Sequence, residues 1–409
     1  MFFDSLLYDA TFATTKSYNQ LAVEIKSSHG VEISKQGIDQ RFNEGAAKYI
    51  ESLIGEQLCE QVLHSIDTGW FKHFKRIIIK DSTKFDVSKN LKEKLPGFGG
   101  CASEAGTCIQ YEFDVKSGYV NDLAITPAKR PDVKDSLETI NKVRAGDLTI
   151  RDMGYFVIDY FRGIQEEKAF FISRLKPKVV VYQKKGNKFE EIDFVGLYHM
   201  MTKNNIERLD KQVFIGSDEK FPVRLVIGLI PEEVVAARMQ KINKYNKKKG
   251  RQTGKDYINK ARFNLFITNI PDDIMKSEAI ANIYKIRWQI ELIFKAWKSI
   301  FGLDNVGQMK YTRLMCLLNA RLLLILINWE TLMTERYNLF KKTGRLLSVY
   351  KCTKTLKDNS RDLRRILTNG CKGLEQWIRW VNEIFKSNHW LEEKKKKMGF
   401  EKIMCLNVL

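Results

Sequence analysis

The segment KSEAIANIYKIRWQIELIFKAWKSIFGL, residues 276–303, has the apolar periodicity of an α-helix. At about 100° per residue, the polar residues Tyr284, Arg287, Glu291 and Lys298 fall within an arc of about 60°. An apolar stripe beside this arc predicts a helix with one side in a core and the neighbouring edge on a cleft. The stripe consists of Ile283, Ile286, Ile290 and Phe294. A carboxylate between cations on one face suits an anionic ligand, and the alternative is a solvated charged face.

The composition indicates a soluble, strongly basic protein. Its 409 residues suggest two to four domains, and 69 Lys and Arg against 49 Asp and Glu give a net charge of +20. Such a charge favours a polyanionic partner, most commonly nucleic acid, and we find no lipidation motif or basic amphipathic anchor for a membrane. The seven cysteines show no paired spacing, and an acid, Asp4, stands where a signal peptide would be basic. We therefore expect a cytoplasmic, nucleoid-associated protein.

The N-terminal residues predict a helix-turn-helix. Apolar residues repeat at helical spacing from Tyr18 to Ile25, residues 28–30 break the pattern, and Ser34 can cap a second helix that runs through Ala46. Four polar residues of the second helix are expected to point away from its apolar side: Lys35, Gln36, Gln40 and Asn43. These side chains can contact base edges or phosphates, although helical pairs with polar outer faces are also common without DNA.

Two short buried strands each deliver an aspartate. The β-branched run at residues 77–79 is followed by Asp81, and the run at residues 148–151 is followed by Asp152. Taken singly, each aspartate is more often a turn or cap residue. Together with Glu291 they supply three carboxylates, enough to hold two Mg²⁺ or Mn²⁺ ions for phosphoryl transfer. The scattered histidines form no zinc pattern.

The rest of the chain is organised around these residues. Several predicted strands between Asp152 and Glu291 indicate a β-rich insertion, which ends in a basic helix at residues 232–255. That helix is either a solvated connector or a DNA contact. The apolar run at residues 322–329 is too short for a membrane span and predicts a buried helix in a helical C-terminal region. This region is either a subunit contact or a layer on the catalytic domain.

The polar arc resembles a known signature. The spacing of Tyr284, Arg287, Glu291 and Lys298 is similar to the Tyr-Arg-Glu-Lys motif of the bacterial insertion-sequence-four family of DDE transposases. The resemblance covers roughly residues 75–305, and the flanking regions match more weakly.

Both aspartates also stand in contexts that resemble this family. Asp81 in KDST is similar to the first catalytic aspartate, and Asp152 in DMGYF is similar to the second. Met153 departs from the family, in which an arginine is common at that position. The departure puts a local DNA contact in doubt but leaves the expected metal ligands in place.

The resemblance implies a mixed α/β fold with a ribonuclease-H-like catalytic domain at residues 71–168 and 262–310. The β-rich insertion is then residues 169–261, the helical DNA-binding region residues 1–70 and the C-terminal helical region residues 311–409. It also implies an enzyme that binds the inverted-repeat ends of an insertion sequence and transfers them to target DNA. A homodimer on double-stranded DNA is expected, with no membrane involved.

The resemblance assigns a role to each site residue. Asp81, Asp152 and Glu291 would hold two Mg²⁺ ions, which Mn²⁺ can replace, while water and then a 3′-hydroxyl attack the DNA strands. Relatives cut the second strand through a hairpin, which requires a flipped base. The expected phosphate contacts are Tyr284, Arg287 and Lys298. Trp288 could stack on the flipped base, although a core role is commoner for tryptophan.

Two other functions remain open from the sequence. The first is a catalytically inactive or domesticated DNA-binding protein that acts as an inhibitor or repressor. The second is a ribonuclease-H-like nuclease that cuts DNA without joining it. Retention of the acidic residues argues against the first, and strand-transfer products would exclude the second.

Overall fold

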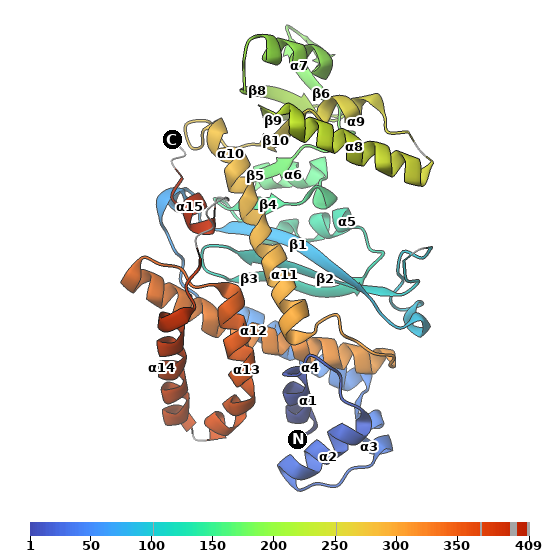
Figure 1. The fold of residues 1–409 in the computed structure, drawn as a ribbon, viewed down its shortest axis with the longest axis vertical. Helices are drawn as coiled ribbons and strands as arrows, with labels where there is room; N and C mark the ends of the chain where they lie inside the picture. Colours follow the sequence, from blue (N-terminus) through green and yellow to red (C-terminus); the bar gives the residue numbers. More distant parts are fainter. Residues whose placement is uncertain (101, 251, 369, 393–398, 407–409) are drawn as a thin grey trace. The chain divides into compact units, whose positions relative to one another are not determined.

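The structure, a computed structural model, describes residues 1–100, 102–250, 252–368, 370–392 and 399–406. The lysine-rich run at residues 394–397 lies outside these ranges. The chain forms two compact units. Figure 1 labels the helices and strands that belong to them. The first unit comprises Met1–Ile66, Asp81–Arg130 and Trp288–Gly399, and the second comprises Asp67–Lys80, Pro131–Arg287 and Phe400–Leu409. Helices and strands occur in both units, so the predicted mixed α/β class is confirmed, while the predicted domain boundaries remain a prediction.

The first unit is mainly helical. Its helices are α1 (Phe2–Ala10), α2 (Tyr18–His29), α3 (Lys35–Arg41), α4 (Glu44–Cys59), α11 (Trp288–Phe301), α12 (Tyr311–Thr343), α13 (Val349–Thr368) and α14 (Gly370–Asn388). Its strands are β2 (Gly106–Asp114), β3 (Val120–Pro127) and the second half of β1 (Ile77–Asp86), in the order β3-β2-β1. The alternating apolar residues at 108–115 and 119–126 predict a hairpin, which is confirmed, since β2 and β3 pair antiparallel. The first predicted strand is longer than expected, because β1 continues past Asp81 to Asp86.

The second predicted N-terminal helix is interrupted. The chain leaves the helical conformation at Phe42, where α3 ends, and α4 begins two residues later. Asn43 caps α4, because its Oδ1 accepts a hydrogen bond from the backbone N–H of Ala46 at 2.9 Å. The prediction of one helix from Ser34 through Ala46 is therefore wrong, since a side-chain cap competes with helix continuation.

Helix α12 packs against the β2–β3 hairpin. The Trp329 indole N–H donates to the carbonyl of Gly118 at 2.6 Å, and its ring lies 5.5 Å from that of Phe113. Gly118 has a φ of 85°, and a Cβ there would lie 2.3 Å from Cγ of Met333, so this close approach requires glycine. By length and composition α12 could span a membrane, yet 78% of its most apolar window is buried in the protein. This agrees with the prediction of a buried helix at residues 322–329.

A buried carboxylate in α1 makes the stability of the first unit depend on pH. Burial raises the pKa of Asp9 to about 6, although the charges of Lys16 and Arg321 oppose the shift. The folded protein therefore favours protonated Asp9. The contribution of protonated Asp9 to the free energy of unfolding is fully present below about pH 4 and is lost as the pH rises through 6. We expect Asp9→Asn to raise the free energy of unfolding at pH 7.5 by up to about 3 kcal/mol and to have little effect near pH 4.

Urea unfolding of both proteins at the two pH values measures this difference. Asp39→Asn is the control with the opposite sign, because hydrogen bonds from Lys310 and Tyr18 lower the pKa of Asp39. Its removal should therefore destabilise the protein at neutral pH. A loss of stability at pH 7.5 in Asp9→Asn would contradict the prediction.

The second unit is built on a mixed sheet. Its strands are the first half of β1 followed by β4 (Leu148–Arg151), β5 (Phe170–Arg174), β10 (Phe263–Thr268), β9 (Phe221–Leu229), β8 (Arg208–Ile215), β6 (Val181–Lys185) and β7 (Lys188–Glu191). The pairs β1–β4 and β4–β5 are parallel, and every later pair is antiparallel. Its helices are α5 (Asp132–Glu138), α6 (Ile158–Glu166), α7 (Phe194–Lys203), α8 (Glu232–Lys249), α9 (Lys255–Lys260), α10 (Ser277–Ile283) and α15 (Phe400–Met404).

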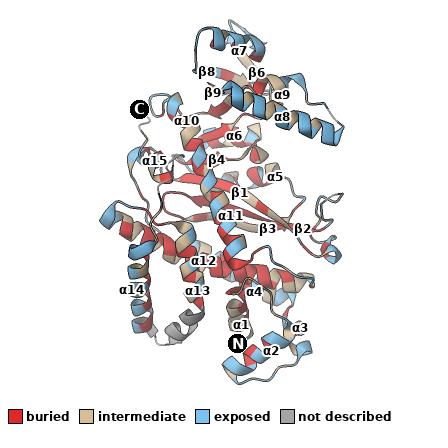
Figure 2. Cartoon of the chain, viewed as in Figure 1, coloured by how far each residue is buried: buried red, intermediate tan, exposed pale blue. Residues whose placement is uncertain are grey.

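The strand-rich segment after residue 169 agrees with the sequence patterns, with one exception. The pattern at residues 189–195 predicts a strand, but β7 stops at Glu191 and α7 begins at Phe194. Asp193 caps α7 by accepting a hydrogen bond from the N–H of Val195 at 2.9 Å. The basic helix predicted at residues 232–255 corresponds to α8, which ends earlier than predicted, at Lys249, because Gly250 takes the left-handed conformation. Helix α8 has no buried residue and lies largely exposed (Figure 2).

Candidate active site

In the second unit, strands β1 and β4 pair in parallel, and their last matched residues directly precede the two predicted aspartates. Lys80 pairs with Arg151, the last matched pair of the two strands. Asp81 follows Lys80 within β1, and Asp152 is the first residue after β4. Asp152 also caps a 3₁₀ helix, Met153–Tyr155, by accepting a hydrogen bond from the N–H of Gly154 at 3.4 Å. Its side chain is 44% exposed, so it keeps access to solvent despite this cap role.

In the first unit an open groove of about 680 Å³ contains two of the three predicted carboxylates. Asp81 from β1 and Glu291 from α11 both line it, together with the Lys298 side chain. Asp81 Oδ1 accepts a hydrogen bond from the N–H of Ser82 at 2.8 Å, and Lys298 Nζ donates to the carbonyl of Lys84 at 3.2 Å. Carboxylate oxygens of this kind are the donors that Mg²⁺ prefers, so the residues present fit such an ion.

The segment that carries the signature is not one regular α-helix. Helix α10 ends at Ile283, residues Tyr284–Arg287 form a 3₁₀ turn, and α11 begins at Trp288. The predicted arc of about 60° is therefore wrong, because a 3₁₀ turn has fewer residues per turn than an α-helix. The predicted apolar stripe is confirmed, since all four of its residues are buried.

The 3₁₀ turn lies against the end of β4 in the second unit. Tyr284 is buried against Phe266, with ring centroids 5.3 Å apart, and its hydroxyl donates to the carbonyl of Arg151 at 3.3 Å. Arg287 Nε lies 4.0 Å from Oδ1 of Asp152. The turn thus brings a guanidinium to the second aspartate.

Comparisons with known proteins indicate the same family as the sequence motifs do. A family model described as a transposase DDE domain matches residues 72–327, more than half of the chain. The chain belongs to the DDE transposase family. The transposase for insertion sequence element IS231D of Bacillus thuringiensis subsp. finitimus is 33% identical over 405 residues, 95% of this chain and 84% of the relative. The transposase for insertion sequence element IS1151 of Clostridium perfringens is 29% identical over 353 residues, 81% and 74% of the two chains.

The predicted family is therefore confirmed, and the protein is a transposase of an insertion sequence element with a DDE domain. Use of a divalent metal and binding of DNA follow from this family. Within the ranges that the structure describes, no group of three or more His, Cys, Asp and Glu side chains is close enough to hold a metal ion. The structure assigns Asp81 and Glu291 to a groove of the first unit and Asp152 to the second unit.

Trp288 was expected to have a core role, but 56% of its surface is exposed to solvent. The expectation of a core role is therefore wrong. The apolar periodicity of α11 did not reveal this, because Trp288 is the first residue of the helix and lies beside the buried stripe. Leu292, one turn further along α11, is also exposed.

The polar residues of the predicted helix-turn-helix are on the surface of the transposase. Lys35, Gln36, Gln40 and Asn43 are all exposed, as the pattern predicted. The Asn43 side chain is already bonded to the backbone, since its Nδ2 donates to the carbonyl of Gln40 at 3.0 Å and its Oδ1 caps α4. The first three therefore have more freedom to contact a ligand.

Three residues near the site were missed from the sequence. Asp304 and Lys295 line the groove with Glu291, and the position of Lys295 one turn after Glu291 was a usable signal. Lys176 is the third. Burial lowers the pKa of Lys176, while the negative charge of Asp152 raises it. Its position just after β5 offered no signal, since the neighbouring charge comes from a distant part of the chain.

Proposed function

We propose that this transposase cuts the ends of its insertion sequence and joins them to target DNA with two divalent cations held by Asp81, Asp152 and Glu291. The observation that carries the proposal is the parallel register of Lys80 with Arg151, because each is followed by one of the aspartates. The groove shared by Asp81 and Glu291 supports the third ligand. Mg²⁺ is the proposed ion, and Mn²⁺ is expected to substitute for it.

The two ions, when bound, would activate the attacking oxygen and stabilise the leaving oxygen of the phosphodiester. The protein's own residues would bind and orient the DNA. Lys298, beside Glu291 in the groove, suits a backbone phosphate, and Arg287 would balance negative charge near Asp152. Tyr284 has its hydroxyl on the Arg151 carbonyl, so we assign it to holding the end of β4 as well as to the proposed phosphate contact.

Second-strand cleavage through a hairpin is part of the proposal. A flipped base costs a few kcal/mol of lost stacking, which an aromatic platform can offset. The exposed ring of Trp288 supports this role, since it starts the helix that carries Glu291.

The proposed architecture is a ribonuclease-H-like catalytic domain with a β-rich insertion and helical flanking regions, divided as the sequence predicted. The exposed Lys35, Gln36 and Gln40 of α3 support contacts between the N-terminal region and the element ends. Two ends must be held together for transfer, so we propose a homodimer on DNA. The transposase would act in the cytoplasm, on the nucleoid.

The test is incubation of the full-length transposase with labelled DNA that carries its own element ends, together with a target plasmid. With Mg²⁺ we expect nicks at the ends, hairpin ends and joined products, and with EDTA none of these. Nicked DNA without joined products would support a nuclease in place of a transposase. Binding without any cut in Mg²⁺ or Mn²⁺ would support the inactive DNA-binding alternative.

A further inference from the structure

Two cationic side chains are buried side by side next to the strand ends of the second unit. Lys80 is 0% exposed and Arg151 4% exposed, and they are the paired residues of β1 and β4. The Lys80 ammonium lies 2.5 Å from Oδ2 of Asp135, a buried carboxylate on α5. The burial of two like charges opposes folding unless both find partners.

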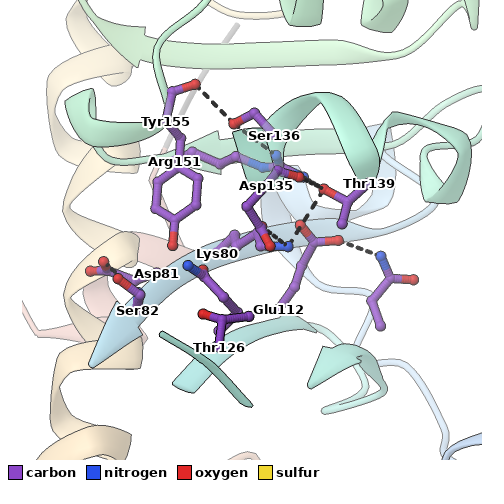
Figure 3. Close-up of polar contacts among 12 residues, drawn as sticks. Lys80, Asp81, Ser82, Glu112, Thr126, Asp135, Ser136, Thr139, Arg151 and Tyr155 are labelled. Carbon is purple, nitrogen blue, oxygen red and sulfur yellow. Dashed lines mark hydrogen bonds and ion pairs between the residues drawn. The ribbon is translucent and has the colours of Figure 1, made fainter. Parts of the chain in front are cut away.

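Helix α5 and the turn after it supply those partners. Arg151 donates through Nη1 to Ser136 Oγ and through Nη2 to Thr139 Oγ1, each at 3.3 Å. Lys80 Nζ lies 3.5 Å from the same Thr139 hydroxyl (Figure 3). One short helical segment therefore binds both strands at matched positions.

Further contacts fix this segment and the Arg151 side chain. The Arg151 guanidinium lies 4.1 Å from the ring centroid of Tyr160, and Ser136 Oγ donates to the carbonyl of Tyr155 at 2.9 Å. Tyr155 is in the 3₁₀ turn that Asp152 caps. The network thus extends from the residue before Asp81 to the turn after Asp152.

Stability alone does not account for these residue types. A buried ion pair is often no more stabilising than apolar residues of similar volume, and its better-supported value is a fixed geometry. In this sheet the neighbouring positions of β1 and β4 are apolar or small, namely Ile77, Ile78, Ile79, Leu148, Thr149 and Ile150. The two cations occur only at the last matched pair, directly before the aspartates.

We propose that Asp135, Lys80 and Arg151 are positioning residues, which hold the last matched pair of β1 and β4 in the register that presents Asp81 and Asp152 to divalent metal. This inference rests on the proposed metal ligands. Residues that orient metal ligands typically change metal affinity by about 10- to 100-fold when they are replaced. The network should therefore affect metal affinity more than DNA binding.

The test compares Mn²⁺ binding by variants of the full-length transposase bound to end DNA, with free Mn²⁺ measured by electron paramagnetic resonance. For Asp135→Asn we expect Mn²⁺ binding about 10- to 100-fold weaker and end-DNA affinity within about twofold of wild type. The double variant Lys80→Met with Asp135→Leu replaces the pair by apolar groups. We expect it to recover thermal stability but not Mn²⁺ affinity, which a merely structural role would not produce.

Asp210→Asn is the matched control, because Asp210 pairs with the buried Arg224 in the same unit but away from the strand ends. It should lose stability and keep wild-type Mn²⁺ affinity. Wild-type affinity in Asp135→Asn, or an equal loss in Asp210→Asn, would overturn the positioning role. If Asp81→Asn and Asp152→Asn also bind Mn²⁺ like the wild type, the proposed metal ligands are wrong and the inference falls with them. Weak binding in those two variants with normal binding in Asp135→Asn rejects the positioning role alone.

Discussion

Replacement of Glu291 by alanine is expected to lower metal-dependent cleavage at the element ends at least about a thousandfold, a loss of about 4 kcal/mol of transition-state stabilisation. The reason is that Glu291 faces the same groove as Asp81, where it would complete the ligands of a divalent ion. A metal ion supplies several kcal/mol in phosphoryl transfer, and a lost carboxylate ligand removes most of it. End-DNA binding should persist, because the substitution removes no basic residue from this strongly basic chain and leaves the exposed N-terminal residues unchanged.

Single-turnover cleavage of labelled end DNA in Mg²⁺ measures the rate, and a gel-shift assay in Ca²⁺ measures binding. Asp304→Ala is the matched comparison, since Asp304 lines the same groove but lies outside the signature. We expect it to keep cleavage within about tenfold of wild type, a change of less than 1.4 kcal/mol. Equal rates for wild type and Glu291→Ala would remove Glu291 from the mechanism.

Replacement of Arg224 by methionine is expected to lower the free energy of unfolding by about 3 kcal/mol or more, at the level seen when a buried ion pair loses one partner. Arg224 is buried in β9 and makes a bidentate pair with Asp210 on β8, in which Nε donates to Oδ1 and Nη2 to Oδ2. Its Nη1 also donates to the carbonyls of Ile270 and Met275, at 2.9 and 2.7 Å. Methionine fills the space of the stem but leaves both carbonyls without this donor.

Urea unfolding followed by circular dichroism measures this loss. Arg208→Met is the control from the neighbouring strand, because Arg208 pairs with Glu278 in a more exposed position. An exposed pair of this kind contributes about 0 to 1 kcal/mol, so the control should unfold near the wild-type urea concentration. Similar losses in both variants would mean that burial of Arg224 does not decide its contribution.

The sequence by itself determined the family, the mixed α/β class and most of the strands. The runs at residues 77–79 and 148–150 are short, rich in apolar or β-branched residues and buried, as is typical of strands inside a sheet, and this pattern is local to each run. The apolar stripe of the signature segment was also predictable, because helical periodicity is a local pattern as well. The motif spacing was also visible, since it depends only on the order of residues along the chain.

Only the tertiary structure decided where the signature segment departs from a regular α-helix and which of its residues are buried. Periodicity at about 100° per residue assumes a regular helix, and it cannot register a 3₁₀ turn at Tyr284–Arg287. Nor can it anticipate that the Tyr284 hydroxyl finds a carbonyl on β4 while Trp288 stays exposed. The partners in these contacts come from distant segments.

The buried charges show the same division most clearly. In the sequence, Lys80 and Asp9 are ordinary charged residues beside apolar neighbours. The fold gives Lys80 a carboxylate from α5 and leaves Asp9 in a core that raises its pKa. The order of residues along the chain thus determined which side chains were candidates for the site of the transposase. Long-range packing decided which of them are desolvated, paired or open to a ligand, because desolvation depends on atoms that the chain brings together only when it folds.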